Sequence, residues 1–262
     1  MNRAKEIVLP ERPFAALPEG ISEDSFLGGT VTLRQPVRGY RAAIDPVMLA
    51  ASVNAGPGER VLEAGTGHGA PAICLARRVP ECIVTGLEIQ PDLVRLANDN
   101  ARLNGLAKNV QVMIGDLGRQ MPRIAAGAFD HVMANPPFLD AAHAHKSPDG
   151  GRAAANVEGE AKLRDWVEFL LRMVRPKGTV TLIHRADRLD EILTLLYGNA
   201  GETVVFPLWP KRDVDAKRVI ICARKGIRAP LTMSPGLILH EDDGSYTKQA
   251  DAILRGGACY LR

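Results

Sequence analysis

The fold of this chain is decided by nine residues, Val61-Leu62-Glu63-Ala64-Gly65-Thr66-Gly67-His68-Gly69. The first part is an apolar run interrupted by an acid, and the last five residues include three glycines. Residues 70–78, which follow, have the composition of a helix. We therefore predict a buried strand, a glycine turn and a helix. Such a turn lets a ligand approach the backbone, and the helix start offers N–H groups that have no partner within the helix.

The glycines alone leave the ligand open. Gly65, Gly67 and Ala70 also satisfy the dinucleotide fingerprint G-x-G-x-x-G/A, and Glu88 lies near the position expected to bind a ribose. Glu63 precedes the first glycine by two residues, and a third glycine follows the second. An anionic side chain at this position favours a cationic ligand over a pyrophosphate.

The composition is that of an ordinary soluble globular chain. It has 262 residues, of which 46% are hydrophobic and 24% charged, with a formal net charge of +3. This charge is too small to predict a nucleic-acid partner by itself. We find no apolar run of membrane length and no signal peptide. The four cysteines are scattered without C-x-x-C spacing, so we expect reduced thiols, no metal site and a cytoplasmic location.

Strands and helices alternate along most of the chain. The predicted strands are Arg60–Glu63, Cys82–Leu87, Val110–Ile114, Phe129–Ala134 and Thr179–Ile183. The predicted helices are Ala70–Arg78, Pro91–Leu103, Lys162–Val174 and Leu189–Leu196. This order predicts an α/β fold, a Rossmann-like, doubly wound and mainly parallel sheet. Thr203–Phe206 and Val219–Ala223 are expected to close it as a C-terminal antiparallel hairpin, and residues 139–157 to form a long loop.

Ahead of the sheet we expect a separate N-terminal region. Residues 1–23 hold prolines and mixed charges without a period and are predicted to be an irregular arm. Ser25–Leu33 is predicted to be a short hairpin. A buried helix follows, with Asp45 as its cap and Pro46 at its first position.

Polar residues lie at the ends of the first four strands of the predicted sheet. They are Glu63 with the glycine turn, Glu88, Asp116 and Asn135. In an open parallel sheet, ligands bind beyond the carboxyl ends of the strands. These four positions therefore predict one site.

The string Asn135-Pro136-Pro137-Phe138 indicates the chemistry. Each proline fixes its own φ, removes an N–H donor and holds the preceding residue extended. The segment therefore presents two acceptors, the Asn135 side-chain oxygen and the Pro136 carbonyl, beside the flat face of Phe138. This arrangement suits a planar substrate that carries an –NH2 group. Such an amine is a poor nucleophile because its lone pair is delocalised, so fixed orientation and electrostatics would assist its reaction.

These motifs carry a resemblance. E-x-G-x-G-x-G from Glu63 and N-P-P-F from Asn135 resemble the class I S-adenosylmethionine-dependent methyltransferases that act on amines. Gln35, Gly39-Tyr40-Arg41 and Ile44-Asp45, with C-terminal strings from Leu239 to Gly256, resemble the bacterial tRNA adenine-N6 methyltransferase family acting on valine tRNA. The resemblance covers most of the chain from about Ser25. It implies an arm and hairpin over 1–45 and a methyltransferase catalytic domain over 46–262, with S-adenosyl-L-methionine as cofactor.

The resemblance also implies roles for single residues. Glu63 would serve the amino end of the methionine, and Gly65, Thr66 and Gly67 would approach the cofactor through backbone. Further roles fall on Glu88 for the ribose hydroxyls, Asp116 for the adenine amine, Ile89 and Leu117 on either side of that ring, and Asn135 and Pro136 for the target amine. Arg41 and Asp45 would border the methionine end or the substrate entrance. No metal is required.

The substrate remains open at this point. Two basic clusters, one of Arg34, Arg38 and Arg41 and one over residues 209–228, would suit RNA phosphates or simply form a solvated rim. A protein glutamine methyltransferase of the release-factor type also uses N-P-P-aromatic, but such enzymes usually carry a helical N-terminal domain. A non-catalytic cofactor- or RNA-binding module and, more distantly, a nicotinamide oxidoreductase are also compatible with parts of the sequence. We expect an RNA substrate, most simply tRNA.

Overall fold

The computed structural model describes residues 19–39, 41–119, 124–137 and 161–261. Within these residues a nine-stranded sheet forms the centre of the molecule, and a two-stranded sheet lies beside it. The strands of the large sheet are β3 (Arg60–Ala64), β4 (Ile83–Glu88), β5 (Val110–Ile114), β6 (Phe129–Ala134), β7 (Val174–Arg185), β8 (Ala200–Trp209), β9 (Arg218–Lys225), β10 (Thr232–Met233) and β11 (Leu237–Ile238). The helices are α1 (Ile44–Ser52), α2 (Ala70–Arg78), α3 (Pro91–Leu103), α5 (Leu163–Met173), α6 (Leu189–Leu196) and α7 (Lys248–Leu254).

The strand order confirms the doubly wound prediction. It runs β10-β8-β9-β7-β6-β3-β4-β5, and β11 also pairs with β8. Strands β3 to β7 are parallel to their neighbours in this set, whereas β9 is antiparallel to both β7 and β8. The predicted closing hairpin is therefore present as β8 and β9. From β3 the chain winds outward through β4 and β5 and then returns to β6, so the topological switch point lies between β3 and β6.

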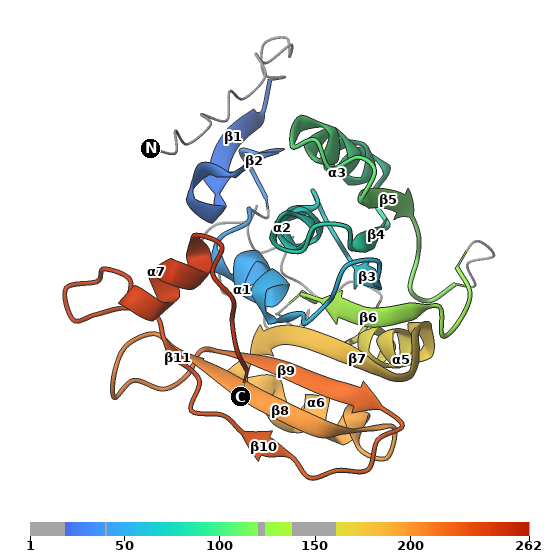
Figure 1. Cartoon of the computed structure of the whole chain (residues 1–262), viewed down its shortest axis with the longest axis vertical. Helices are drawn as coiled ribbons and strands as arrows, with labels where there is room; N and C mark the ends of the chain where they lie inside the picture. The colour runs from blue at the N-terminus through green and yellow to red at the C-terminus, as the bar shows by residue number, and fades with distance from the viewer. Residues whose placement is uncertain (1–18, 40, 120–123, 138–160, 262) are drawn as a thin grey trace, which may run out of the picture.

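Helices cover both faces of the large sheet. One core cluster packs α1, α2, α3 and α7 against one face, and a second packs α5 and α6 against the other. Figure 1 shows α1, α2 and α3 gathered on the same side. Helix α2 is buried from Ala70 to Ala76, which fits its nearly all-apolar sequence. No helix in the described part of the chain has the length and apolarity needed to cross a bilayer.

The N-terminal region differs from its prediction at two points. Strand β1 spans Ile21–Phe26 and pairs with β2, Val31–Pro36, so the irregular arm cannot extend to residue 23. Asp45 does not cap α1, because the cap residue is Ala43 and makes no side-chain hydrogen bond. Asp45 instead accepts from Arg218 across the molecule at 3.0 Å. The ion pair with a distant strand, which short-range patterns do not show, takes the carboxylate away from the helix start.

Several other boundaries differ from their predictions, and the junction of α5 and β7 is the clearest case. Helix α5 ends at Met173 rather than at Val174. Strand β7 begins at Val174, whereas the sequence predicted a start at Thr179. The register between β6 and β7 shifts between Phe129 and His131 to take up the extra residues. A Cβ at Gly178 would lie 2.5 Å from the Asp130 carbonyl oxygen, so this irregular passage depends on a residue without a side chain. The short strands β10 and β11 and helix α7 were not predicted, and Thr247 caps α7 through its side chain.

Candidate active site

A pocket of about 380 Å³ opens at the carboxyl ends of β3, β4, β5 and β6. This is the switch point at which an open α/β sheet binds its ligands. The pocket collects most of the predicted site residues: Glu63, Gly65, Thr66, Gly67, Glu88, Ile89, Asp116, Leu117, Asn135 and Pro136. The polar strand ends that predicted one site therefore do meet in one cavity.

The strand register explains why these residues meet. Ala64 at the end of β3 pairs with Leu87 on one side and Ala134 on the other. Glu88 pairs in turn with Ile114 of β5. Because parallel strands in register end at the same level, the residues that follow them leave the sheet side by side. The glycine turn, the Glu88 carboxylate and the Asn135 segment consequently form three adjacent walls.

Glu63 is a buried carboxylate on the floor of this pocket. Only 1% of the residue is exposed. Its Oε2 accepts hydrogen bonds from Thr66 Oγ1 at 2.5 Å and from the Ala72 N–H at 3.0 Å. Burial nevertheless raises the pKa of Glu63 to about 8, with a smaller contribution from the neighbouring Glu88. A buried carboxylate with a raised pKa is stabilised in its ionised form when a cationic ligand group arrives.

Glu88 is held by backbone. Its Oε2 accepts from the Gly67 N–H at 2.9 Å and its Oε1 accepts from the Gln90 N–H at 3.0 Å. These bonds fix the orientation of the carboxylate, and each oxygen keeps a further lone pair. Two acceptor oxygens directed into a pocket suit a pair of vicinal hydroxyls.

Asp116 follows β5 in a turn at the far side of the pocket. Its Oδ1 accepts from the Gly118 N–H at 2.9 Å, and its Oδ2 lies 3.1 Å from Arg119 Nε. Ile89, which follows β4, also lines the pocket, although 60% of it is exposed. An exposed branched side chain that lines the same pocket as an acceptor is a suitable surface for a flat ring.

Gly65 is the turn residue whose lack of a side chain has a structural reason. Its φ is +66°, and a Cβ there would lie 2.4 Å from Trp166 Cη2. Trp166 comes from α5 and lines the pocket, and within the described residues its buried indole nitrogen has no hydrogen-bond partner. Gly67 also has a positive φ of +56°, but its position faces open space. The turn is therefore packed on one side and accessible on the other.

Asn135, Pro136 and Pro137 all line the pocket, on the wall that follows β6. Pro136 is buried, and the other two are partly buried. His184 of β7 is fully buried behind this wall. Burial and then the charge of Arg188 lower the pKa of its imidazole to about 4. Backbone hydrogen bonds that involve Arg185 and Pro137 act in the opposite direction but are outweighed. His184 is thus a neutral group behind the segment. Phe138 lies outside the described residues, and its stacking role stays a prediction.

Arg41 and Asp45 do not line the pocket. The Arg41 guanidinium binds Asp24 Oδ2 at 2.7 Å, Ser22 Oγ at 2.6 Å and the Pro36 carbonyl at 3.0 Å. Asp45 is paired with Arg218. Both side chains are thus engaged in contacts within the protein, one behind the rim of the pocket and one at the start of β9.

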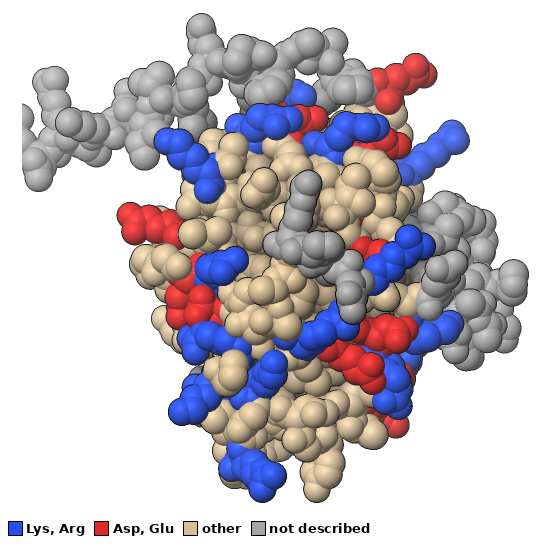
Figure 2. All heavy atoms as spheres, turned by 90° about the vertical axis from the view of Figure 1, so that its right-hand side faces the viewer, with Lys and Arg blue, Asp and Glu red and all other residues tan. Residues whose placement is uncertain are grey.

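The second basic cluster does not form one surface. Because β9 is antiparallel to β7, Arg218 lies level with Arg185 near the pocket edge of the sheet, whereas Arg224 lies level with Thr179 at the opposite edge. Arg224 also pairs with Glu202 at 3.0 Å. On the face drawn in Figure 2, Lys and Arg side chains are likewise spread out, with Asp and Glu among them. Arg224, which belongs to this cluster in the sequence, therefore lies away from the pocket.

Several pocket residues were not predicted to bind the cofactor or the target amine, although Arg38, Gly39 and Ala70 belong to motifs or clusters that the sequence indicated. They are Pro36, Arg38, Gly39, His68, Pro71, Gln90, Leu93, Gly115, Ala161 and Trp166, with Leu87 and Ala70. His68 stands inside the glycine motif, and burial, then the charge of Arg41, lowers the pKa of its imidazole to about 4. Trp166 belongs to an amphipathic helix in which an aromatic residue predicts only core packing.

Comparison with known proteins identifies the family. A family model described as a methyltransferase domain matches residues 55–199, which include the glycine turn and the Asn135 segment. The chain belongs to this methyltransferase family. A tRNA1(Val) (adenine(37)-N6)-methyltransferase from Porphyromonas gingivalis is 30% identical over 201 residues, which are 73% of this chain and 76% of that protein.

One further relative by sequence and one solved structure are also similar to this chain. A release factor glutamine methyltransferase from Rhodospirillum rubrum is 36% identical over 183 residues, 67% of this chain but only 54% of that protein. Among solved structures, a predicted O-methyltransferase from Agrobacterium tumefaciens aligns over 82% of this chain and 98% of its own, with a TM-score of 0.69 at 23% identity. The fold is that of class I Rossmann-like methyltransferases, as the resemblance implied.

S-adenosylmethionine is the cofactor of this methyltransferase family. The pocket fits it on three observations: its volume lies within the usual range for small-molecule sites of about 300–1,000 Å³, Gly67 leaves the turn open, and its lining includes three carboxylates, Glu63, Glu88 and Asp116. All three carboxylates are hydrogen-bond acceptors. They match a ligand whose donors are an ammonium group, two ribose hydroxyls and an adenine amine. A dinucleotide pyrophosphate would instead meet the Glu63 carboxylate at the glycine turn.

Proposed function

We propose that this methyltransferase methylates the exocyclic N6 of an adenine in tRNA. The observation that carries the proposal is the position of Asn135 and Pro136, which line the cofactor pocket directly beside the glycine turn. Their acceptors suit an amine that is conjugated to a ring. A cytoplasmic location follows from such a substrate and belongs to the same proposal.

In this proposal each wall of the pocket has its own task. Glu63 pairs with the ammonium group of the methionine end, and Gly65, Thr66 and Gly67 approach the cofactor through backbone. Glu88 accepts from the ribose hydroxyls and Asp116 from the adenine amine, while Ile89 and Leu117 cover the ring. S-adenosylmethionine supplies an electrophilic methyl group when bound.

The reacting amine is held by the Asn135 segment. Two acceptors fix both amine hydrogens, so the nitrogen is directed at its partner rather than rotating freely. As the nitrogen acquires positive charge, the Asn135 side-chain oxygen stabilises it more strongly than it does the neutral amine. The prolines keep the segment from relaxing, because their φ angles are fixed.

The relatives support tRNA over protein as the substrate. Proteins named tRNA1(Val) (adenine(37)-N6)-methyltransferase match this chain over most of their length, as in Aeromonas hydrophila, where 79% of this chain covers 85% of that protein. The release factor glutamine methyltransferase of Rhodospirillum rubrum is covered over only 54%. The shared part is the catalytic fold, and the uncovered part is where substrate-binding segments can differ.

Glutamine methylation is the second candidate, favoured by the 36% identity to that release factor enzyme. The two candidates separate in one competition experiment. Purified protein, labelled cofactor, unmodified valine tRNA transcript and a release-factor peptide are combined, and label is followed into each substrate. Labelled N6-methyladenosine in the RNA supports the proposal, whereas label in the peptide with inert RNA refutes it.

A further inference from the structure

We propose that Arg38 binds a backbone phosphate of the RNA beside the target nucleotide, and that a clasp of Asp24, Gln35 and Arg41 holds Arg38 at the mouth of the pocket. The inference rests on the proposed function, because it names how the same site recognises its substrate. Arg38 and Gly39 line the pocket from the segment that follows β2, next to Pro36 at the end of that strand.

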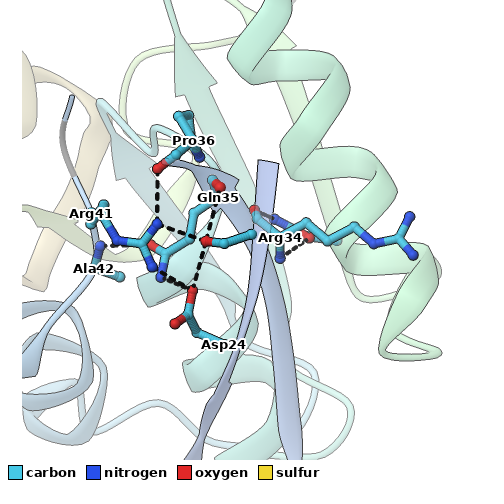
Figure 3. A network of polar contacts seen from close by, with 8 residues as sticks. Asp24, Arg34, Gln35, Pro36, Arg41 and Ala42 are labelled. Carbon is cyan, nitrogen blue, oxygen red and sulfur yellow. Dashed lines mark hydrogen bonds and ion pairs between the residues drawn. The ribbon is translucent and has the colours of Figure 1, made fainter. Parts of the chain in front are cut away.

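The clasp joins the hairpin to the start of α1. Gln35 is only 1% exposed. It donates from Nε2 to Asp24 Oδ2 at 2.8 Å and accepts from the Ala42 N–H at 2.8 Å. The Arg41 guanidinium closes the ring by binding both Asp24 and the Pro36 carbonyl. Figure 3 shows these groups converging from β1, β2 and the segment before α1. Both ends of the segment that carries Arg38 are thereby tied to one carboxylate.

The pKa of the Asp24 carboxyl indicates that the clasp persists at neutral pH. Partial burial alone would raise this pKa, but the hydrogen bond from Gln35 and the charge of Arg41 lower it below its ordinary value. Asp24 is therefore ionised throughout the physiological range, and the ion pair with Arg41 is always available.

The other edge of the hairpin is fixed by helix α3. Asn100 and Asn104 each bind the backbone N–H and carbonyl of one β2 residue, Arg34 and Thr32 respectively, at 2.7–2.9 Å. Four helical residues rise about 6 Å and two strand residues about 6.7 Å, so one helical turn matches the strand repeat. Asn100 also donates to the His68 carbonyl in the glycine turn at 2.9 Å. The hairpin is thus coupled to the pocket itself.

The three arginines of the first basic cluster, Arg34, Arg38 and Arg41, therefore have different roles. Arg34 pairs with Glu23 at 3.2 Å and Arg41 with Asp24 at 2.7 Å, so both neutralise acids of β1. Arg38 is exposed, and in the described part of the chain no carboxylate pairs with it. Since the acidic residues of the pocket lie along the cofactor walls, a cation at the mouth is left to meet the substrate.

A phosphate is the group that such a cation recognises best. The planar guanidinium matches phosphate oxygens with two parallel N–H donors. A target base that enters the pocket brings its flanking phosphates to the rim, because they remain attached through the sugar. A neutral glutamine side chain in a peptide offers no such group, so Arg38 would also discriminate between the two candidate substrates.

The test is steady-state methylation of a valine tRNA transcript by Arg38→Gln, Arg41→Gln and the double variant. We expect Arg38→Gln to raise the KM for RNA about tenfold with kcat and cofactor affinity unchanged, and to reduce the salt slope by about one. Arg41→Gln should raise the same KM, and the double variant should be no worse than Arg38→Gln alone, because both act through one contact. Asp24→Asn serves the same purpose if Arg41→Gln does not fold.

Arg34→Gln is the matched control, since it removes the same charge from the same hairpin. It should change the KM for RNA less than about twofold. Two results would overturn the inference and leave the proposed function intact. One is an increase in the KM for RNA that is additive in the double variant. The other is an Arg38→Gln protein that loses cofactor affinity while it keeps its KM for RNA. Wild-type protein that methylates the peptide and not the RNA would overturn the proposed function, and the inference with it.

Discussion

Replacing Glu63 by Gln should make the ligand-free protein more stable at neutral pH while weakening cofactor binding. Burial raises the pKa of Glu63 from its ordinary 4.5 to about 8. The folded state therefore holds a proton that the unfolded state has already released. In that situation stability falls as pH rises between the two pKa values, and the loss is complete above the folded one. Glutamine carries no proton equilibrium and escapes this loss.

The size of the effect follows from the shift. Each pH unit between 4.5 and 8 costs the wild type about 1.4 kcal/mol relative to Glu63→Gln. From pH 4.5 to pH 7 the difference in unfolding free energy should therefore change by about 3 kcal/mol in favour of the variant. The constant part of the difference, from altered hydrogen bonds to Thr66, does not depend on pH and cancels from this comparison.

The assay is urea unfolding of both proteins at a series of pH values, with cofactor removed because bound ligand would stabilise only the folded state. Glu59→Gln is the control of opposite sign. The hydrogen bond from His131 lowers the pKa of Glu59, so this carboxylate stabilises the wild type above its unfolded pKa, and its contribution is lost as pH falls. A Glu63→Gln difference that is the same at about pH 5 and about pH 7.5 would refute the reasoning about burial.

Three other predictions concern the same pocket. Asn135→Ala should reduce single-turnover methyl transfer about a hundredfold to a thousandfold with little change in cofactor titration; near-normal rates would show that Asn135 is structural. Gly65→Ala should abolish cofactor binding, because its Cβ would lie 2.4 Å from Trp166, whereas Gly105→Ala, which has a similar positive φ of +69° but lies outside the pocket, should retain it; equal losses would contradict the packing argument. Cofactor affinity should rise by up to about tenfold per pH unit from about pH 6 to about 8 as Glu63 loses its proton. Calorimetry in two buffers should detect release of this proton when the cofactor binds. An affinity that does not change with pH would exclude Glu63 as the partner of the ammonium group.

The sequence was sufficient for the sheet and for most of the pocket. Helices Ala70–Arg78 and Pro91–Leu103 and strand Phe129–Ala134 were predicted with their observed ends. Proline at the helix starts and glycine after strands are local signals, and parallel topology then places the strand ends together. Residues at those ends were predictable because the fold rule concerns position rather than side-chain contacts.

The remaining features depend on contacts between distant segments. Asp45 was expected to cap a helix, yet Arg218, 173 positions away, pairs with it. Trp166 is one aromatic residue in an amphipathic helix, and only the tertiary structure brings it against Gly65. Arg41 was predicted to border the methionine end or the substrate entrance, and the structure adds that Asp24 on β1 pairs with it. No short-range pattern separates an arginine that binds its own chain from one, such as Arg38, that faces the pocket.

Nucleoside mass spectrometry of tRNA from a deletion strain tests the central claim most directly. The proposed function predicts that one N6-methyladenosine is lost from a tRNA of the deletion strain, restored by the wild-type gene and not restored by the Asn135→Ala gene. Unchanged tRNA nucleosides in the deletion strain, together with loss of methylglutamine from a release factor, would contradict it.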